Sequence, residues 1–150
     1  MKRKTFAEMD CSVAQTLEIV GDPWTLLIVR DAFFGITRFA DFQRRLGTPR
    51  NTLTERLSLL NDHGILERHR YQDRPPRDEY RLTAKGRDLH GVIISLMLWG
   101  DRWAGLDDAP VEIIDETTGQ PLDPVLVDRA SGVPIAELPA RPRRRDEIPE

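Results

Sequence analysis

Short polar side chains recur in the segment RNTLTERLSLLND at spacings that would gather them on or beside one face of an α-helix. They are Asn51, Thr54, Glu55 and Ser58. Leu53, Leu57 and Leu60 follow each other at i, i+4 and i+7 and would form the opposite, buried face. Asn can pair with adenine and Glu can accept a hydrogen bond from cytosine N4, so the polar face could read base edges. Alone, it fits an ordinary solvated face equally well.

Two arginines flank this polar face. Arg50 and Arg56 suit phosphates, which supply most of the affinity for DNA but carry no sequence information. Thr48 and Pro49 form a capping signal, and the positive end of the helix dipole beside them also favours a phosphate. We therefore predict a helix over residues 49–63 whose open side could lie in a groove of DNA.

Residues with catalytic or metal-binding chemistry are few and scattered. His63, His69 and His90 fall in three different predicted elements, and the chain has no Gly-rich phosphate-binding loop. Cys11 is the single cysteine, which excludes an intrachain disulfide and a zinc site built from several cysteines. We expect no enzymatic activity, no metal and no cofactor.

Capping residues divide the first part of the chain into short helices. The apolar spacing in CSVAQTLEIVG predicts a first helix. Asp22 and Pro23 suit the N-cap and first position of a second helix, whose run 24–34 is apolar nearly all round and should be buried. Thr37 is expected to cap a third helix in TRFADFQRRLG, and Gly47 to end it.

A basic hairpin is predicted directly after the fourth helix. ILERHRY and EYRL are strand-like and flank a Pro-broken tip, QDRPPRD. Arg74 and Arg77 in this tip are best placed to reach the minor groove or its phosphates, although they could serve solubility alone. Two short helices joined by LGT and followed by such a hairpin are typical of a winged helix-turn-helix.

A long helix, AKGRDLHGVIISLMLWGDRWAG, is predicted after a cap at Thr83. Three internal glycines each weaken it by about 1 kcal/mol relative to Ala, so it requires a packing partner. Little of the small domain remains to cover its apolar stripe, so a second copy of the chain is the expected partner. The stripe residues in this contact are Val92, Leu96, Trp99 and Trp103.

The chain changes in character after residue 105. IDETTGQPL and VDRASGVPI share the pattern apolar-Asp-x-x-hydroxyl-Gly-x-Pro-apolar, which predicts a β-hairpin-like appendage over 106–138. Neither turn contains Cys or His, so the appendage should be metal-free. It could cover the long helix, extend a dimer contact or help to form an effector pocket. The remaining divisions are a flexible arm (1–10), a DNA-binding and dimerisation domain (11–105) and a disordered charged tail (139–150).

The net charge of -3 is unevenly distributed. Residues 38–87 contain 12 Lys and Arg against 7 Asp and Glu, whereas residues 101–139 contain 2 against 9. A basic middle suits a polyanion, although chance could also produce it. No apolar run reaches the roughly 18 residues of a membrane span. The basic start MKRKTFAEMD precedes no apolar signal region, so we expect a cytoplasmic protein without a membrane partner.

Four segments resemble the HxlR-type branch of the MarR-like winged-helix regulators of bacteria. They are CSVAQTLEIVGDPWTLLIVRDAFFG, TRFADFQRRLG, RNTLTERLSLLNDHGILER and YRLTAKGRDL. The resemblance covers about two thirds of the chain, from Cys11 to Trp103. It implies a mainly α fold with a small β-hairpin and a homodimer that binds an inverted repeat in double-stranded DNA. It also implies that the first helix joins the dimer interface, which adds Val13 and Leu17 to the predicted contact.

The resemblance also assigns roles to single residues. Arg38, at the start of the third helix, and Arg56 correspond to phosphate contacts. The positions that fall on the recognition helix are Asn51, Thr52 and Glu55. Relatives usually carry Lys where this chain has Pro23, so a phosphate contact from that position is lost or moved.

Cys11 lies where relatives often carry a cysteine, which in some of them senses oxidants or electrophiles. Sensing requires an exposed thiol that ionises readily; the neighbouring Glu8 and Asp10 oppose ionisation, and a small capping residue without a sensing role is the alternative. We predict a sequence-specific, nucleoid-associated regulator, a repressor, with a redox switch of the same fold as the alternative. A winged helix used only for protein contacts would not need the basic hairpin. Nothing in the sequence identifies a small-molecule effector.

Overall fold

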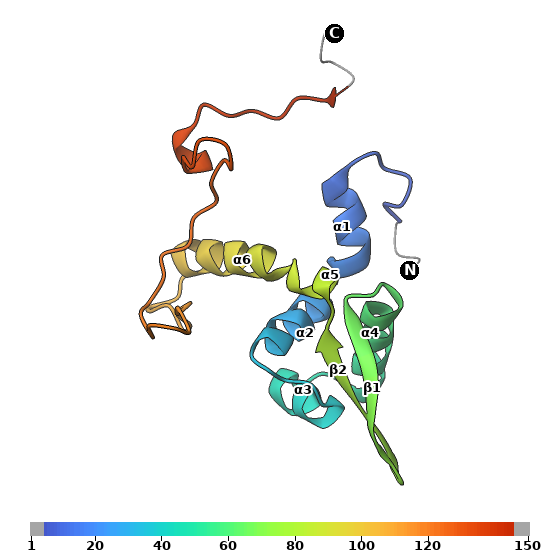
Figure 1. Ribbon diagram of the computed structural model, residues 1–150. Helices are drawn as coiled ribbons and strands as arrows, with labels where there is room; N and C mark the ends of the chain where they lie inside the picture. The colour runs from blue at the N-terminus through green and yellow to red at the C-terminus, as the bar shows by residue number, and fades with distance from the viewer. Residues whose placement is uncertain (1–4, 146–150) are drawn as a thin grey trace.

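The computed structural model describes residues 5–145 and consists of a helical body with a two-stranded hairpin, a protruding helix and a C-terminal appendage (Figure 1). The helices are α1 (Ser12–Val20), α2 (Pro23–Phe33), α3 (Phe39–Leu46), α4 (Arg50–Asp62), α5 (Ala84–Arg87), α6 (His90–Trp103) and the 3₁₀ helix η1 (Ile135–Glu137). The strands are β1 (Leu66–Asp73) and β2 (Pro76–Leu82), which pair antiparallel. The predicted mainly α fold with a small hairpin is confirmed.

α2 lies at the centre of the body, as its apolar sequence predicts. Ile28 and Val29 are completely buried and belong to one core cluster with Phe42 of α3 and the leucines of α4. Asp22 begins the helix, since its Oδ1 accepts a hydrogen bond from the backbone N–H of Trp24 at 2.9 Å. Local capping rules were sufficient here because donor and acceptor are two residues apart.

The turn between α3 and α4 is short and depends on Gly47. This residue has φ +62°, in the left-handed region that strains other side chains, and its N–H donates to the carbonyl of Gln43. The predicted cap by Thr48 does not form. Pro49 is the N-cap of α4 without a side-chain bond, while the Thr48 hydroxyl is buried and has no hydrogen-bond partner within residues 5–145.

The predicted cap of the third helix is also wrong. α3 begins at Phe39 with Arg38 as its N-cap, which makes no side-chain capping bond. The carbonyl of Thr37 instead accepts a hydrogen bond of 2.7 Å from the N–H of Tyr80, and Arg38 forms an isolated bridge with Glu79. The start of α3 is therefore attached to β2, and no local pattern reveals a contact between segments so far apart in sequence.

The strands of the hairpin are longer than the sequence predicts, with one register shift between Arg70 and Gln72. The strand ladder continues to the pair Asp73–Pro76, so only Arg74 and Pro75, joined by a cis peptide bond, form the turn. The predicted loop 72–78 is therefore mostly strand. The two strands of the hairpin extend away from the helical body, so the tip is free to contact a partner (Figure 1).

The single long helix predicted after the hairpin is two helices. Thr83 does cap the first, accepting a hydrogen bond of 3.0 Å from the N–H of Gly86, but α5 ends at Arg87 and α6 begins at His90. A Cβ on Gly86 would lie 2.1 Å from the carbonyl oxygen of Ile65. α5 is thus held closely against the base of the hairpin, and α6 leaves the body in a different direction (Figure 1).

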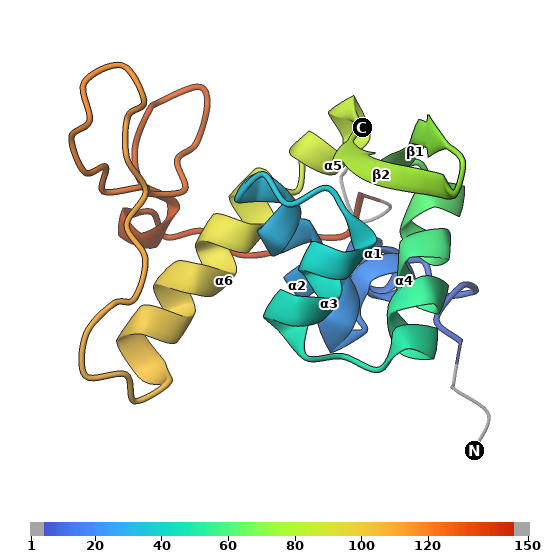
Figure 2. The ribbon, with the colours of Figure 1, turned by 90° about the horizontal axis from the view of Figure 1, so that it is seen from below.

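The two repeats of the appendage form equivalent turns beyond α6 (Figure 2). The N–H···O pairs that close them are Asp115–Gln120 and Asp128–Val133, both at 2.9 Å. Hydrogen bonds from the backbone of Thr117 to Asp115, and from the Ser131 hydroxyl and backbone to Asp128, hold the pKa of both carboxyls below the usual range. The predicted repeat is thus visible as a repeated turn geometry.

The described part of the N-terminal arm lies against α1. Gln15 Nε2 donates to the carbonyl oxygens of Ala7 and Met9 at 2.9 and 2.8 Å. Hydrogen bonds therefore hold a segment for which the sequence predicts flexibility. Residues 1–4 of that arm and 146–150 of the predicted disordered tail lie outside the described residues.

Candidate nucleic-acid interface

α4 presents its polar face to solvent. Leu53, Leu57 and Leu60 are completely buried, so the opposite side of the helix must face outward. The exposed members of the predicted base-reading set are Asn51, Thr54, Glu55 and Ser58. Thr52 is half-buried at the edge of this face. The structure therefore brings four of the five residues to one open surface, and base reading by them stays a prediction.

A groove beside this face collects three of the predicted phosphate-binding arginines. Arg38 from the start of α3, Arg50 from the start of α4 and Arg77 from β2 all line it. The Arg38 guanidinium lies 4.7 Å from the ring centroid of Tyr71, and that of Arg50 lies 5.1 Å from the ring centroid of Phe39. Rings beneath the cations leave their N–H groups free to bind acceptors.

Carboxylates in the same groove are already paired. Asp41 accepts a short hydrogen bond from Arg44, and Asp78 accepts from Arg68 and, at 3.2 Å, from Arg70. The hydrogen bond from Arg68 holds the pKa of Asp78 below its usual range. Arg68 and Arg70, which strand alternation places on one face, therefore stabilise the hairpin itself.

The remaining hairpin arginines divide in the same way. Arg81 Nη2 pairs with Glu79 at 2.6 Å. Neither Arg74 nor Arg77 forms a salt bridge with any residue of the described range, and the same holds for Arg38 and Arg50. The sequence predicted these four arginines as DNA contacts. The structure adds that no carboxylate of the described range pairs with them, whereas Arg68, Arg70 and Arg81 are paired. Residue type alone could not separate the two groups.

Arg56 has a different environment from the other predicted phosphate contacts. Its Nη2 lies 3.1 Å from Asp22 Oδ2, and only 25% of its side chain is exposed. Its Nε is buried and has no hydrogen-bond partner among residues 5–145. Arg56 thus joins α4 to the N-cap of α2. Its phosphate contact stays a prediction, and no sequence pattern indicates this internal pairing.

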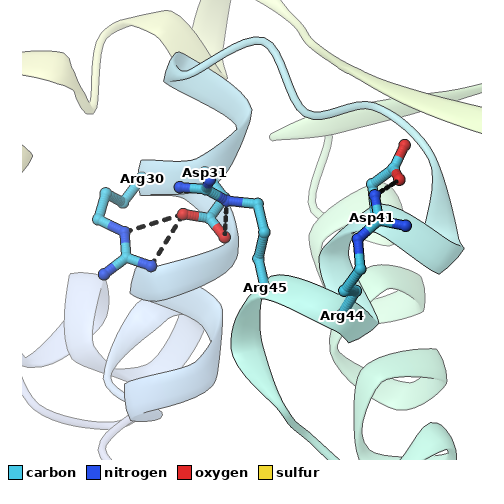
Figure 3. Close-up of polar contacts among 5 residues, drawn as sticks. All are labelled: Arg30, Asp31, Asp41, Arg44 and Arg45. Atoms are coloured by element: carbon cyan, nitrogen blue, oxygen red, sulfur yellow. Dashed lines mark hydrogen bonds and ion pairs between the residues drawn. The ribbon is translucent and has the colours of Figure 1, made fainter.

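A buried carboxylate fixes α3 against α2, and sequence analysis missed it. Asp31 of α2 is completely buried, and its Oδ1 accepts hydrogen bonds from Nε and Nη2 of Arg30 at 3.0 and 2.8 Å. Its Oδ2 lies 3.3 Å from Nε of Arg45 in α3 (Figure 3). A buried charge of this kind is tolerated because it is paired on both oxygens, and the pair with Arg45 joins α3 to α2.

The residues predicted to form a dimer contact are all exposed. On α6, Val92, Leu96, Trp99 and Trp103 are 41%, 50%, 65% and 63% exposed and lie along one side of the helix at i, i+4, i+7 and i+11. On α1 they are Val13 and Leu17, which are 67% and 42% exposed. α6 contains no buried residue at all. Large apolar side chains gathered in this way usually mark an interface.

Cys11 is exposed at the N-cap of α1, next to one of these apolar surfaces. Its side chain makes no capping hydrogen bond. Within residues 5–145, no three His, Cys, Asp or Glu side chains gather where they could share a metal ion. No helix of the described chain is long and apolar enough to cross a bilayer.

A helix-turn-helix with an exposed polar second helix, followed by a hairpin whose tip carries unpaired arginines, defines a winged-helix DNA-binding protein. The model of the HxlR-like helix-turn-helix family matches residues 19–108, which include this whole unit. The chain belongs to the HxlR-like helix-turn-helix family and is a transcriptional regulator.

Similar proteins agree with this assignment. The uncharacterized HTH-type transcriptional regulator Rv3095 of Mycobacterium tuberculosis is 46% identical over 117 residues, which are 77% of this chain and 74% of that protein. The crystal structure of PA1607, a candidate transcription factor, is 36% identical and superimposes with a TM-score of 0.83 over 94% of this chain and 99% of the other. That superposition extends past α6 into the appendage.

A third relative is a redox regulator. HypR in its oxidized form is 32% identical and superimposes with a TM-score of 0.57 over 61% of this chain and 96% of its own. Its reduced form gives a TM-score of 0.60 at 30% identity, over 63% and 95% of the two chains. The superposed part is shorter than for PA1607, so the likeness to HypR concerns less of this chain.

Proposed function

We propose that the protein is a homodimeric repressor that binds an inverted repeat in double-stranded DNA. The observation that carries this proposal is the coexistence of two kinds of open surface on one small domain. One is the polar face of α4 with the unpaired arginines beside it, and the other is the apolar side of α6 with that of α1. Two-fold pairing through the apolar surfaces would present two recognition helices to successive turns of the groove.

Each part of the basic surface has its own expected role. Asn51, Glu55 and Ser58 extend from α4 toward base edges, with Thr52 and Thr54 beside them. The phosphate contacts come from the groove arginines and from the hairpin tip. They are Arg38, Arg50, Arg74 and Arg77. Base contacts select the operator, and phosphate contacts hold α4 in register on it.

The proposal is tested on the DNA upstream of the protein's own gene. Footprinting should show protection of an inverted repeat with one dimer bound, and titration should show affinity that falls steeply with salt. Asn51→Ala should change the preferred base at one position of each half-site by about 1–3 kcal/mol. Binding without salt dependence or sequence preference would refute the proposal.

We also propose that the protein is located in the cytoplasm and has no catalytic activity. A regulator that reads chromosomal DNA works in the cytoplasm, on the nucleoid, and it needs no catalytic group. We further propose that residues 106–138 act as an appendage to the DNA-binding and dimerisation domain over residues 11–105. A transcript that rises when the gene is deleted would support repression, whereas one that falls would indicate an activator.

A second candidate function is a thiol switch on the same fold. Cys11 is exposed and lies two residues before Val13 of the proposed dimer surface, and HypR, a relative, is a redox regulator. Oxidation of Cys11 would then alter how the two copies meet. Cys11→Ser should bind DNA like the unmodified protein but resist release by hydrogen peroxide. Equal release of both proteins by the oxidant would remove this candidate.

A further inference from the structure

Tyr71 of β1 lies on the basic side of the molecule but has no role in the proposed function so far. It lines the groove that also contains Arg38, Arg50 and Arg77. Its side chain is 39% exposed and does not belong to the core cluster. The stability of the core therefore does not depend on this ring, which leaves open what it does among three cations.

The strand ladder is irregular at this residue. The register shifts between Arg70 and Gln72, so Tyr71 has no partner residue in β2. An extra residue of this kind bends the strand and changes the direction of a side chain, and such bulges are frequent beside functional sites. Here the ring of Tyr71 lies against Arg38, which is the N-cap of α3 and lies outside the hairpin.

The contact with Tyr71 orients the Arg38 side chain. The guanidinium carbon of Arg38 lies 4.7 Å from the centroid of the Tyr71 ring. The backbone of Arg38 forms a bridge with Glu79, but its side chain makes no hydrogen bond or salt bridge within residues 5–145. The ring attracts the flat face of the cation, so the N–H groups at its edge remain able to bind an anion.

The hydroxyl of Tyr71 is also available to a ligand. It makes no hydrogen bond with any residue of the described range. Tyrosine hydroxyls are among the side-chain groups that bind the phosphates of DNA. Tyr80, the second tyrosine of the chain, differs because it packs against the core from β2, where burial raises its pKa.

We propose that Tyr71 is a further contact to the DNA backbone and that it positions Arg38. Its hydroxyl would donate a hydrogen bond to a phosphate beside the hairpin, while its ring would hold the Arg38 guanidinium toward the same strand of DNA. This inference rests on the proposed function, because it assigns a role within the same DNA-binding surface. It adds a neutral aromatic side chain to a set that sequence analysis limited to arginines.

Two variants separate the hydroxyl from the ring. Tyr71→Phe keeps the ring and loses the donor, so the affinity for duplex DNA should fall roughly tenfold. The slope of log affinity against log salt should not change, because a neutral group releases no counterion. Tyr71→Leu also removes the support of Arg38 and should bind about two- to fivefold more weakly than Tyr71→Phe. Anisotropy titrations of the full chain measure both, and unmodified affinity in Tyr71→Phe would overturn the proposal.

A double-mutant cycle tests the positioning of Arg38. In an Arg38→Ala background, Tyr71→Leu and Tyr71→Phe should bind DNA equally, because the ring no longer has a cation to hold. A ring that only stabilised the hairpin would cost the same factor in both backgrounds, and this result would refute the positioning. Phe34→Leu is the matched control and should leave affinity unchanged, because Phe34 lies 5.6 Å from the Arg45 guanidinium outside the groove.

The contact between the ring and Arg38 can also be measured without DNA. An aromatic ring shifts the NMR signals of the groups that lie over its face, so Tyr71→Leu should move the Nε–H signal of Arg38. The signal of Arg50, which lies over Phe39, should stay in place. An Arg38 signal that does not respond to Tyr71→Leu would contradict the proposed contact.

The inference and the proposed function can fail separately. Phosphate contacts carry no sequence information, so the losses in the Tyr71 variants should also appear with a duplex of unrelated sequence. If they appear there but no inverted repeat upstream of the gene is protected, the role of Tyr71 stands and the proposed function falls. If the operator is protected and the Tyr71 variants bind it like the unmodified protein, the opposite holds. A protein that binds no duplex at all refutes both.

Discussion

α4 and α6 are amphipathic helices of nearly equal length, 13 and 14 residues, yet they use their two faces in opposite ways. α4 buries Leu53, Leu57 and Leu60 completely and exposes short polar side chains. α6 buries no residue and exposes two tryptophans along one side. The apolar face of α4 is thus completely buried within one copy of the chain, whereas that of α6 remains largely exposed.

The difference shows what each helix still requires. A polar face is stable in water, so α4 needs no further partner to fold, and its open side is available to DNA. An apolar stripe in water forfeits the free energy that burial would provide, about 25 cal/mol per Å². In the proposed dimer, a second copy would cover the stripe of α6 and stabilise the fold, whereas α4 would need a partner only for function.

Matched truncations should produce the largest contrast between the two helices. Leu57→Ala leaves a cavity in the core and should lower the free energy of unfolding by about 2–5 kcal/mol at any protein concentration. Leu96→Ala makes the same chemical change on a side chain that is 50% exposed, so its loss of stability should be smaller in one copy and should increase where dimers form. Urea titrations at several protein concentrations measure both.

A loss for Leu96→Ala that does not depend on protein concentration at all would break the comparison, because it would mean that the exposed half of this side chain gains no cover from a second copy. Equal losses for the two variants would lead to the same conclusion.

Charge on the α6 stripe should separate the subunits. Trp99 is 65% exposed, so Trp99→Arg should leave the fold intact while placing two cations opposite each other in the dimer. Losing the second half-site contact should weaken operator binding by about 10²-fold or more. Sedimentation at micromolar concentration and a gel-shift titration measure the two effects, and a Trp99→Arg dimer would contradict this use of α6.

The arginines on the DNA side differ in whether their charge is free. Arg77→Ala should reduce the slope of log affinity against log salt by about 1, because an unpaired cation that binds a phosphate is lost. Arg81→Ala is the control, since Arg81 already pairs with Glu79 within the hairpin at 2.6 Å. Fluorescence anisotropy across a salt series gives both slopes, and equal changes would show that pairing in the free protein does not predict phosphate contact.

The smallest expected effect is in the appendage. The folded pKa values of Asp115 and Asp128 lie below those of an unfolded chain, about 3.9, so their hydrogen bonds stabilise the turns above that pH. Stability is lost as pH falls through the lowered values. NMR signals of Thr117 and Ser131 should shift in this acidic range, and Asp115→Ala should abolish the shift at Thr117 while leaving the shift at Ser131 in place. A shift at Thr117 that persists in that variant would assign it to another group.

Sequence patterns predicted the parts of this fold whose causes are local. The leucine spacing of α4, the Asp22 cap and the left-handed Gly47 each depend on residues within a few positions. The start of α3 and the position of α5 involve distant residues, since Tyr80 binds the Thr37 carbonyl and the Ile65 carbonyl lies against Gly86.

The candidate site follows the same rule. The residue types on α4 and at the hairpin tip were sufficient to predict which face is polar and where positive charge lies. Which arginines remain unpaired was not predictable, because Asp78 and Glu79 select their partners across the strand ladder and along one strand. The pairing of the buried Asp31 was likewise not predictable, because its partner Arg45 comes from the next helix.

The ion pair of Arg56 with Asp22 directly links α4 to the start of α2. Asp22 is the N-cap of α2 and directly follows Gly21, the C-cap of α1, so the Arg56 side chain joins α4 to the link between these two helices. In a symmetric pair of subunits, this connection would set how far apart the two recognition helices stand. Shortening Arg56 would then act on the spacing between half-sites that the protein tolerates, and a regulator that is less strict about spacing would occupy more of the genome.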